Sequence, residues 1–301
     1  LFVVSGMNAR SELEKKDTKT FIKSRTRKLL VPSTIGLLVF GWVLGYYNML
    51  ISNAFDTMGA AVPKPILYII MCLSGTAHLW YIQLLWFFSL LLILIRKIEK
   101  DRLYKIGAKA NSIFMILFVI VIYGAAQILN TPVIVVYRFG IYGVGFLIGY
   151  FVFSHEEVTK MLEKNWILFS LLGLISCVIF VVMYWGKSYP DHSVLDTPVC
   201  NIFAWYGTLG VISFMKKWGD FENKFTKWMT KKSWGLYIFH YLPLAVTAWY
   251  LKDLVPPIPV FLVYLLVAIA AFSGAFVLYE IISRIPIIRW CILGLKVKKE
   301  D

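Results

Sequence analysis

Acidic residues are scarce in this chain. It has 17 aspartates and glutamates against 31 lysines and arginines in 301 residues, so its net charge is +14. Long apolar stretches separate the basic residues, which therefore form no single basic face, and nothing favours a nucleic-acid-binding protein. Long polar segments are also rare: 59% of the residues are hydrophobic and the mean hydropathy is +0.71. These values exclude an ordinary soluble domain and indicate an integral membrane protein whose first partner is the lipid bilayer.

Motifs of cysteine and hydrolase chemistry are missing as well. The four cysteines show no CxxC or metal-ligand spacing, so we expect small apolar packing residues and no metal. A disulfide between Cys72 and Cys200 on the outer side is the remaining alternative. Because no GxSxG or HExxH motif occurs, hydrolase and metalloprotease functions lack support. The charged residues do not form the intramembrane chain of ionisable groups that a proton-driven pump requires.

Eight apolar segments are long enough to be complete transmembrane helices. A bilayer core needs about 20 apolar residues in a helix, and somewhat fewer where aromatic or basic residues anchor the ends. The N-terminal LFVVSGM resembles the end of a further helix. The predicted fold is therefore all-α, a polytopic transmembrane helix bundle that forms a single domain over residues 1–301. The predicted spans are 31–53, 78–95, 111–130, 137–154, 166–185, 199–215, 234–251 and 260–282.

The basic residues predict an orientation for this bundle. With these spans, 27 of the 31 lysines and arginines fall in the connections on one side of the membrane, which are 9–30, 96–110, 155–165, 216–233 and the segment after 282. The positive-inside rule then places these connections and the C-terminus in the cytoplasm, with the protein in the plasma membrane. We expect 283–301 to be a cytoplasmic basic tail that rests on the inner leaflet.

The densest cluster of positive charge lies in FIKSRTRKLLVP, residues 21–32. Arg25, Arg27 and Lys28 lie close together there. We expect a helix to begin at Pro32, since proline is tolerated in a first helical turn. Such a cluster either only sets the topology or also binds an anionic substrate.

The outward connections have a different chemistry. The segment 54–77 contains ILYIIMCL, which is too short to span a bilayer and is expected to lie in the interface or to re-enter. The loop 186–198 is polar and carries Asp191, His192 and Asp196.

Two histidines lie at or within apolar spans, where ionisable side chains are costly and often functional. His78 opens HLWYIQLLWFF, and Trp80 follows it; an aromatic belt at the membrane interface is the alternative explanation. His240 in WGLYIFHYLP shares a helix face with Tyr237, and the alternative there is a neutral core histidine bonded to a helix carbonyl. Because histidine most easily moves a proton near neutral pH, both are candidates for catalysis.

Other candidates have simpler alternative explanations. Arg138, at the outer start of a span, either extends to the interface or binds an anionic or sugar group. Glu280 and Arg284 have the spacing of an intrahelical ion pair. His155 is expected to be solvated in an inner loop. The glycines of YGVGFLIGY are expected to permit close helix packing in lipid.

Six segments in order resemble the signatures of the acyltransferase-3 membrane proteins, with features of the glucan biosynthesis protein C branch. They are LFVVSGM, FIKSRTRKLLVP, HLWYIQLLW, YGVGFLIGY, SWGLYIFHYLP and YEIISRIPIIRW, and they extend over most of the chain. The resemblance implies a bundle of about ten helices. It also implies transfer of an acyl group, such as acetyl, from cytoplasmic acyl-CoA to a hydroxyl of a carbohydrate or similar acceptor outside.

The resemblance also implies particular site residues. The family's Arg-x-x-Arg pattern matches Arg25 and Lys28, where lysine keeps the charge but lacks the planar fork of arginine. The HLWFL-like element begins at His78, and the YxxH element matches Tyr237 and His240. The family's first helix, with a basic residue and a histidine, has no counterpart before Leu1, so the sequence is expected to be a fragment without that helix.

Together these arguments predict three groups of site residues. The catalytic residues are His78 and His240, the groups that bind acyl-CoA are Arg25, Arg27 and Lys28, and the groups that bind substrate are Arg138, Trp80, Tyr237 and Glu280. The rival hypothesis is a transporter or flippase for a glycan or lipid-linked substrate, although no inverted repeat or pair of broken helices supports it. A membrane protein without chemistry is the third alternative.

Overall fold

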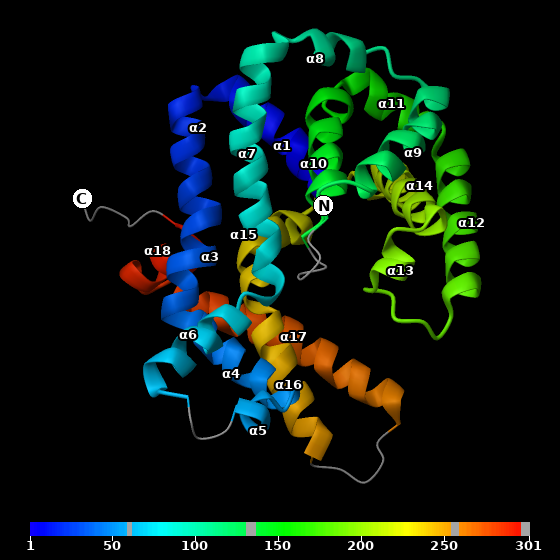
Figure 1. Ribbon diagram of the computed structural model, residues 1–301. Helices are drawn as coiled ribbons and strands as arrows, with labels where there is room; N and C mark the ends of the chain where they lie inside the picture. Colours follow the sequence, from blue (N-terminus) through cyan, green and yellow to red (C-terminus); the bar gives the residue numbers. More distant parts are fainter. Residues whose placement is uncertain (59–61, 131–136, 254–258, 296–301) are drawn as a thin grey trace. The chain divides into compact units, whose positions relative to one another are not determined.

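The chain is helical in the computed structural model, which describes residues 1–58, 62–130, 137–253 and 259–295. These residues form no β-strand, and the only pairing of that kind in them is an isolated bridge between Asn130 and Arg138. The all-α prediction is confirmed (Figure 1).

The helices pack into two compact units, each built from two separate stretches of sequence. Unit 1 comprises Leu1–Ile22 and Phe87–Phe221, and unit 2 comprises Lys23–Trp86 and Glu222–Asp301. The chain passes from one unit to the other within α2 (Thr18–Arg25), within α7 (Trp80–Glu99), and after residue 221. The predicted single domain over 1–301 stays a prediction.

Close backbone contacts hold α1 (Phe2–Lys15) in unit 1 against α10 (Phe139–Ile148) and the π-helical segment that follows it. A Cβ atom at Gly6 would overlap the carbonyl oxygen of Phe146, and one at Gly149 would overlap that of Val3. Glycine is therefore required where these helices meet, as predicted for the YGVGFLIGY segment. The remaining helical segments of unit 1 are α8 (Arg102–Gly107), α9 (Ser112–Ala126), Gly149–Phe153, α11 (Glu156–Lys164), α12 (Trp166–Tyr184), α13 (His192–Leu195), α14 (Pro198–Phe214) and Met215–Gly219.

A continuous helix, Thr18–Ile51, carries the basic cluster. It joins α2, a π-helical turn at Thr26–Leu30, α3 (Val31–Gly36), a second π-helical turn at Leu37–Gly41, and α4 (Trp42–Ile51). The prediction that a helix begins at Pro32 is wrong. In the wide turn, the Val31 N–H donates to the carbonyl of Thr26, five residues back, and the helix continues through Pro32 without a break.

The predicted connection 9–30 is also mostly helical. Between α1 and α2, the carboxylate of Asp17 accepts the backbone N–H of Thr20 at 3.1 Å. Hydrogen bonds from Thr20 lower the pKa of Asp17 below its usual value. The cap lets a new helix start with only two residues between it and the end of α1.

The predicted span 234–251 consists of two helices in unit 2, α15 (Lys224–Phe239) and α16 (Tyr241–Asp253), which break at His240. Pro243 causes the break, because it has no N–H for the carbonyl of Phe239 and its ring crowds the preceding turn. Pro243 lies about one helical turn after His240, so the sequence already indicated that the helix could break there.

Among the residues that the structure describes, five helices are long and apolar enough to cross a membrane, namely Thr18–Ile51, Ala77–Glu99, Trp166–Tyr184, Pro198–Gly219 and Val260–Ile282. They include the predicted spans 31–53, 78–95, 166–185, 199–215 and 260–282, apart from a residue or two at the ends. The predicted spans 111–130 and 137–154 are shorter, at Ser112–Ala126 and Phe139–Phe153. Fifteen residues rise about 22 Å, less than the hydrocarbon core of about 30 Å.

The long helix α17 (Val260–Ile282) and several short segments complete unit 2, namely α5 (Ala54–Met58), α6 (Lys64–Ser74), the 3₁₀ turn Ala77–Leu79 and α18 (Pro286–Leu293). The ILYIIMCL segment lies in α6, which packs against α4. The tail segment α18 packs against α3, with Cys291, Ile292 and Leu293 buried. The protein, and not only a membrane surface, therefore covers one face of α18. The structure describes all four cysteines as free, with Cys72 in unit 2 and Cys200 in unit 1, and the alternative of a disulfide between them stays a prediction.

Candidate functional site

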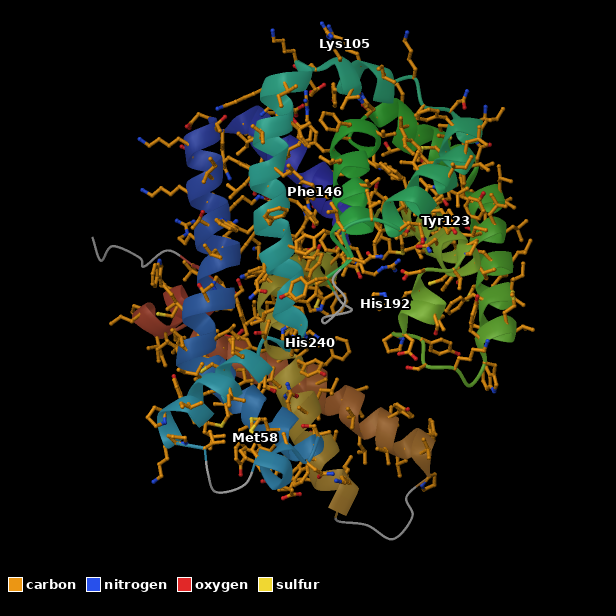
Figure 2. All side chains as sticks on the ribbon, in the orientation of Figure 1. Met58, Lys105, Tyr123, Phe146, His192 and His240 are labelled. Carbon is orange, nitrogen blue, oxygen red and sulfur yellow. The ribbon has the colours of Figure 1, made fainter. Side chains whose placement is uncertain are left out.

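His78 and His240 lie side by side in unit 2, although they are far apart in the sequence. His78 lies in the 3₁₀ turn that precedes α7. His240, which is labelled in Figure 2, lies at the break between α15 and α16. Their ring centroids are 4.8 Å apart, and the ring planes are inclined by 57°. The sequence predicted each of them as a candidate but gave no reason to pair them.

Backbone carbonyls set the proton positions on both rings. The Nδ1 atom of His240 lies 2.9 Å from the carbonyl oxygen of Tyr237 and 3.1 Å from that of Leu236. The Nε2 atom of His78 lies 3.2 Å from the carbonyl oxygen of Ile238. Because a carbonyl oxygen only accepts, each of these nitrogens carries the proton in the neutral ring.

The opposite nitrogens, Nε2 of His240 and Nδ1 of His78, then carry lone pairs. The His78 Nδ1 atom is buried and has no hydrogen-bond partner among the described residues. Two imidazoles with fixed tautomers and lone pairs in one small region can each accept a proton. The carbonyl bond predicted as the alternative explanation for His240 is present, and it also prepares the other nitrogen to act as a base.

Aromatic side chains surround this histidine pair. The Tyr237 hydroxyl donates to the carbonyl of His78 at 2.6 Å, and the Tyr241 ring stacks on the His78 ring with centroids 5.5 Å apart. Trp80 is half-buried and contacts Tyr81 at 6.3 Å between ring centroids. The hydroxyl of Tyr237 thus fixes the backbone of His78. Trp80 lies two residues after His78, at the start of α7.

A series of contacts within unit 2 links the basic cluster to the histidine pair. The Arg27 Nε atom donates to the carbonyl of Gly294 at 3.1 Å. One residue earlier, the Leu293 carbonyl accepts the indole N–H of Trp234 at 2.9 Å. The Trp234 ring in turn stacks on Tyr237, with centroids 5.9 Å apart and planes 24° apart. The end of α18 therefore links the basic π-helical turn to Trp234 and Tyr237, the aromatic residues beside the histidine pair.

The other two residues of the basic cluster differ in their exposure. Arg25 is half-buried and Lys28 is exposed. The π-helical turn Thr26–Leu30, which contains Lys28, is held by Trp86, whose indole N–H donates to the Thr26 hydroxyl at 3.0 Å. Such turns often mark functional positions in helices.

Glu280 has protein partners on two sides. The Nη2 atom of Arg284 lies 3.5 Å from its Oε2 atom, which confirms the predicted ion pair, and Lys232 of α15 pairs with Oε1. Both oxygens are engaged, so Glu280 ties α15 to α17. Its predicted contact with substrate stays a prediction.

Arg138 lies in unit 1 and is only 5% exposed, so its side chain does not extend to the interface. Its Nη2 atom donates to the Leu195 carbonyl at 3.1 Å and to Asp196 Oδ1 at 3.3 Å. His155, which was predicted to be solvated, is also buried, and its Nε2 atom lies 2.9 Å from the Tyr104 carbonyl. The prediction for His155 is wrong because the ring of Tyr104, on α8, covers the His155 ring.

Sequence reasoning missed Arg10 of α1. Its guanidinium stacks on the Tyr104 ring, 3.7 Å from the centroid, and its Nη1 atom donates to the Tyr150 hydroxyl at 3.3 Å. Arg10 and His155 line a polar cavity of about 460 Å³. Because Arg10 also pairs with Glu14 at 2.8 Å, its charge is already balanced within the protein.

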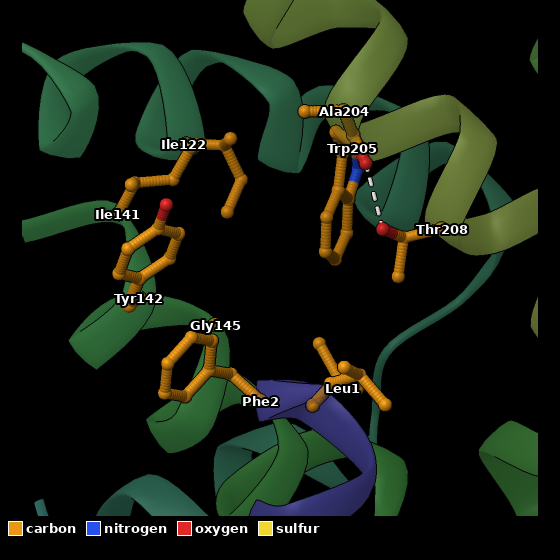
Figure 3. A pocket seen from close by; sticks show the side chains of 10 residues that line it. Leu1, Phe2, Ile122, Ile141, Tyr142, Gly145, Ala204, Trp205 and Thr208 are labelled. Carbon is orange, nitrogen blue, oxygen red and sulfur yellow. Dashed lines mark hydrogen bonds between the residues drawn. The ribbon is translucent and has the colours of Figure 1, made fainter. Parts of the chain in front are cut away.

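A second cavity in unit 1, of about 180 Å³, is mainly apolar (Figure 3). Phe2, Ile122 and Trp205 form its walls. The Thr208 hydroxyl at its edge donates to the carbonyl of Ala204 at 2.6 Å. This cavity can hold an apolar group, but it offers little proton chemistry.

Comparison with known proteins supplies the identity. A family model described as an acyltransferase domain matches residues 1–280. No curated protein and no solved structure matches the chain. The match extends over both histidines, the basic cluster and nearly all of Glu280's helix, and the apolar helices are those of a membrane protein. The chain belongs to the acyltransferase-3 family and is a membrane acyltransferase.

Proposed function

We propose that this protein transfers an acyl group from acyl-CoA, on the side of the basic connections, to a hydroxyl of a carbohydrate on the opposite side. The observation that carries this proposal is the histidine pair, in which backbone carbonyls leave a lone pair on each ring. A general base of this kind typically contributes 10²–10⁴-fold to a rate.

In this mechanism His240 or His78 takes the proton of the acceptor hydroxyl. The hydroxyl oxygen then bonds to the acyl carbon, the carbon–sulfur bond of the thioester breaks, and the thiolate of coenzyme A takes up a proton. Acyl-CoA is a substrate here, and the proposal requires no bound cofactor or metal.

The phosphates of coenzyme A bind at Arg25 and Lys28, which lie three residues apart; Arg25 is half-buried just before the π-helical turn, and Lys28 is exposed within it. Arg27 is partly engaged with Gly294, so it acts in this proposal mainly by placing the turn. Hydrogen bonds between charged groups and phosphate each contribute about 1.5–3 kcal/mol.

The test uses variants that keep the carbonyl bonds and remove only the lone pairs. The amide nitrogen of asparagine reproduces Nδ1 and that of glutamine reproduces Nε2, so His240→Asn and His78→Gln each retain the donor. We expect at least one of them to lower kcat by about 10²-fold or more, with transfer measured from radiolabelled acyl-CoA in purified membranes. His155→Gln, which keeps its donor to Tyr104, is the matched control and should retain activity.

Donor binding is tested separately. Arg25→Gln and Lys28→Gln should each weaken acyl-CoA binding about tenfold or more, whereas Lys19→Gln, on the exposed start of α2, should not. Unchanged rates in both histidine variants would contradict the assignment of the base. Absence of labelled acceptor with the unmodified protein would contradict the transferase itself and would favour a transporter.

A further inference from the structure

A group of polar side chains in unit 1 has hydrogen-bonding capacity that the described residues do not use. Its centre is Asp196, at the end of α13. The Oδ1 atom of Asp196 accepts from Arg138 at 3.3 Å and from Asn130 at 3.4 Å, and its Oδ2 atom lies 3.2 Å from Nδ1 of His192. Asn201 joins the group because its amide nitrogen and Arg138 both donate to the carbonyl of Leu195. We call these residues the Asp196 cluster.

Four buried atoms of the Asp196 cluster have no hydrogen-bond partner in the described part of the chain. They are Nε2 of His192, Oδ1 of Asn130, Oδ1 of Asn201 and Nε of Arg138. Arg138 is 5% exposed and Asn201 is fully buried, so these two side chains are not ordinary surface groups, while the side chain of His192 is 36% exposed and Asn130 is half-buried. A buried polar atom without a partner destabilises the protein, and four in one cluster point to a polar ligand.

The chemical character of the unused atoms follows from their neighbours. The Asn130 amide nitrogen donates to the Ala126 carbonyl at 2.7 Å, and that of Asn201 donates to the Thr197 carbonyl at 2.8 Å. Carbonyls only accept, so these nitrogens are fixed and the amide oxygens are the unused acceptors. In the same way the carboxylate of Asp196 places the proton of His192 on Nδ1, which leaves the lone pair on Nε2.

The Asp196 cluster therefore offers three acceptors and one donor at nearly zero net charge, because Arg138 balances Asp196. An anion such as phosphate would face three lone pairs and a carboxylate. A metal cation would face the buried guanidinium of Arg138. A neutral ligand with several hydroxyl groups fits, since each hydroxyl can donate to an acceptor and one can accept from Arg138.

We propose that the Asp196 cluster binds the hydroxyl groups of a carbohydrate. The proposal deepens the proposed function, on which it rests for the role of that carbohydrate as the acyl acceptor. Its location agrees with that role, because the loop 186–198 is predicted to lie on the side opposite to the basic connections. His192 acts here by accepting a hydrogen bond from the ligand, and the proton transfer of the reaction is left to the histidine pair of unit 2.

The test measures ligand binding directly with the full chain in lipid nanodiscs. The probes are neutral glucose trisaccharides with α- and β-linkages, and inorganic phosphate is the comparison. We expect at least one trisaccharide to bind and phosphate not to bind. His192→Leu should lower the affinity for the trisaccharide at least tenfold. His192→Gln should bind it with an affinity within about threefold of the unmodified protein, because the glutamine amide can present an acceptor. Ser193→Ala, at the exposed neighbouring position of α13, is the matched control and should bind normally.

Acyl transfer measured on the same preparations separates the two proposals. If His192→Leu raises KM for the acceptor at least tenfold with little change in kcat, the Asp196 cluster is the acceptor site. If the trisaccharides bind as expected but no acyl group is transferred, carbohydrate binding stands and the proposed function fails. Failure of every trisaccharide to bind the unmodified protein, or equal binding by folded His192→Leu, would overturn the inference while leaving acyl transfer intact.

Discussion

Replacement of Gly294 by alanine should release α18 from the basic π-helical turn. Gly294 follows α18 with a φ of 61°, in the left-handed region, and its carbonyl accepts the Arg27 Nε–H at 3.1 Å. A Cβ atom at this position would overlap the carbonyl oxygen of Arg27 and lie 2.9 Å from Cα of Lys28. Both obstacles are backbone atoms, so no change of side-chain rotamer relieves the clash.

Two costs add up in this variant. A residue with a Cβ atom in the left-handed conformation costs roughly 1–2 kcal/mol. Overpacking against fixed neighbours costs about 1–3 kcal/mol. A sum of about 3 kcal/mol changes the equilibrium between packed and released α18 about 100-fold, because each 1.4 kcal/mol is about a factor of ten.

The buried thiol of Cys291 on α18 reports this equilibrium. In a background without the other three cysteines, a maleimide should label Cys291 about 100-fold faster in Gly294→Ala than in the parent. Gly186→Ala is the matched control, since Gly186 also has a positive φ, 75°, but has nothing within 4 Å of its Cβ position. It should leave the labelling rate unchanged. A rate in Gly294→Ala within twofold of the parent would refute the reasoning.

Two further predictions concern a stacked cation and a helix break. Arg10→Lys should lower the stability of the protein in detergent by about 2 kcal/mol, because lysine cannot stack a planar group on the Tyr104 ring at 3.7 Å; an unchanged thermal midpoint would contradict this. Pro243→Ala should supply an N–H for the carbonyl of Phe239, close the break at His240 and lower acyl transfer at least tenfold through misplacement of the ring. Its thermal midpoint should not fall, and full activity with a continuous helix would contradict the role of the break.

Local sequence patterns predicted part of the candidate site. His78, His240 and Tyr237 could be named because an ionisable or polar side chain in an apolar segment is costly, and the Glu280–Arg284 pair followed from helical spacing. Their grouping could not be predicted. The distance between the two histidines depends on how α7 and α15 pack, and no local pattern contains that information.

The predictions that failed have a common origin. Each treated a segment as if its chemistry were decided by its immediate neighbours. Pro32 was expected to start a helix, but the π-helical turn before it, with its hydrogen bond across five residues, lets the helix continue through it. His155 was expected to be solvated because its neighbours are charged, but Tyr104 from another helix covers it.

By itself, then, the sequence determined the properties that depend on composition and on neighbouring residues, namely the fold class and the family. The apolar runs determined an all-α membrane protein, and six ordered motifs indicated a family that the comparison then confirmed. Only the tertiary structure decided which polar groups share one environment. The lone pairs of His78 and His240 and the unused atoms of the Asp196 cluster depend on which carbonyls and carboxylates lie opposite them, and long-range packing sets those positions.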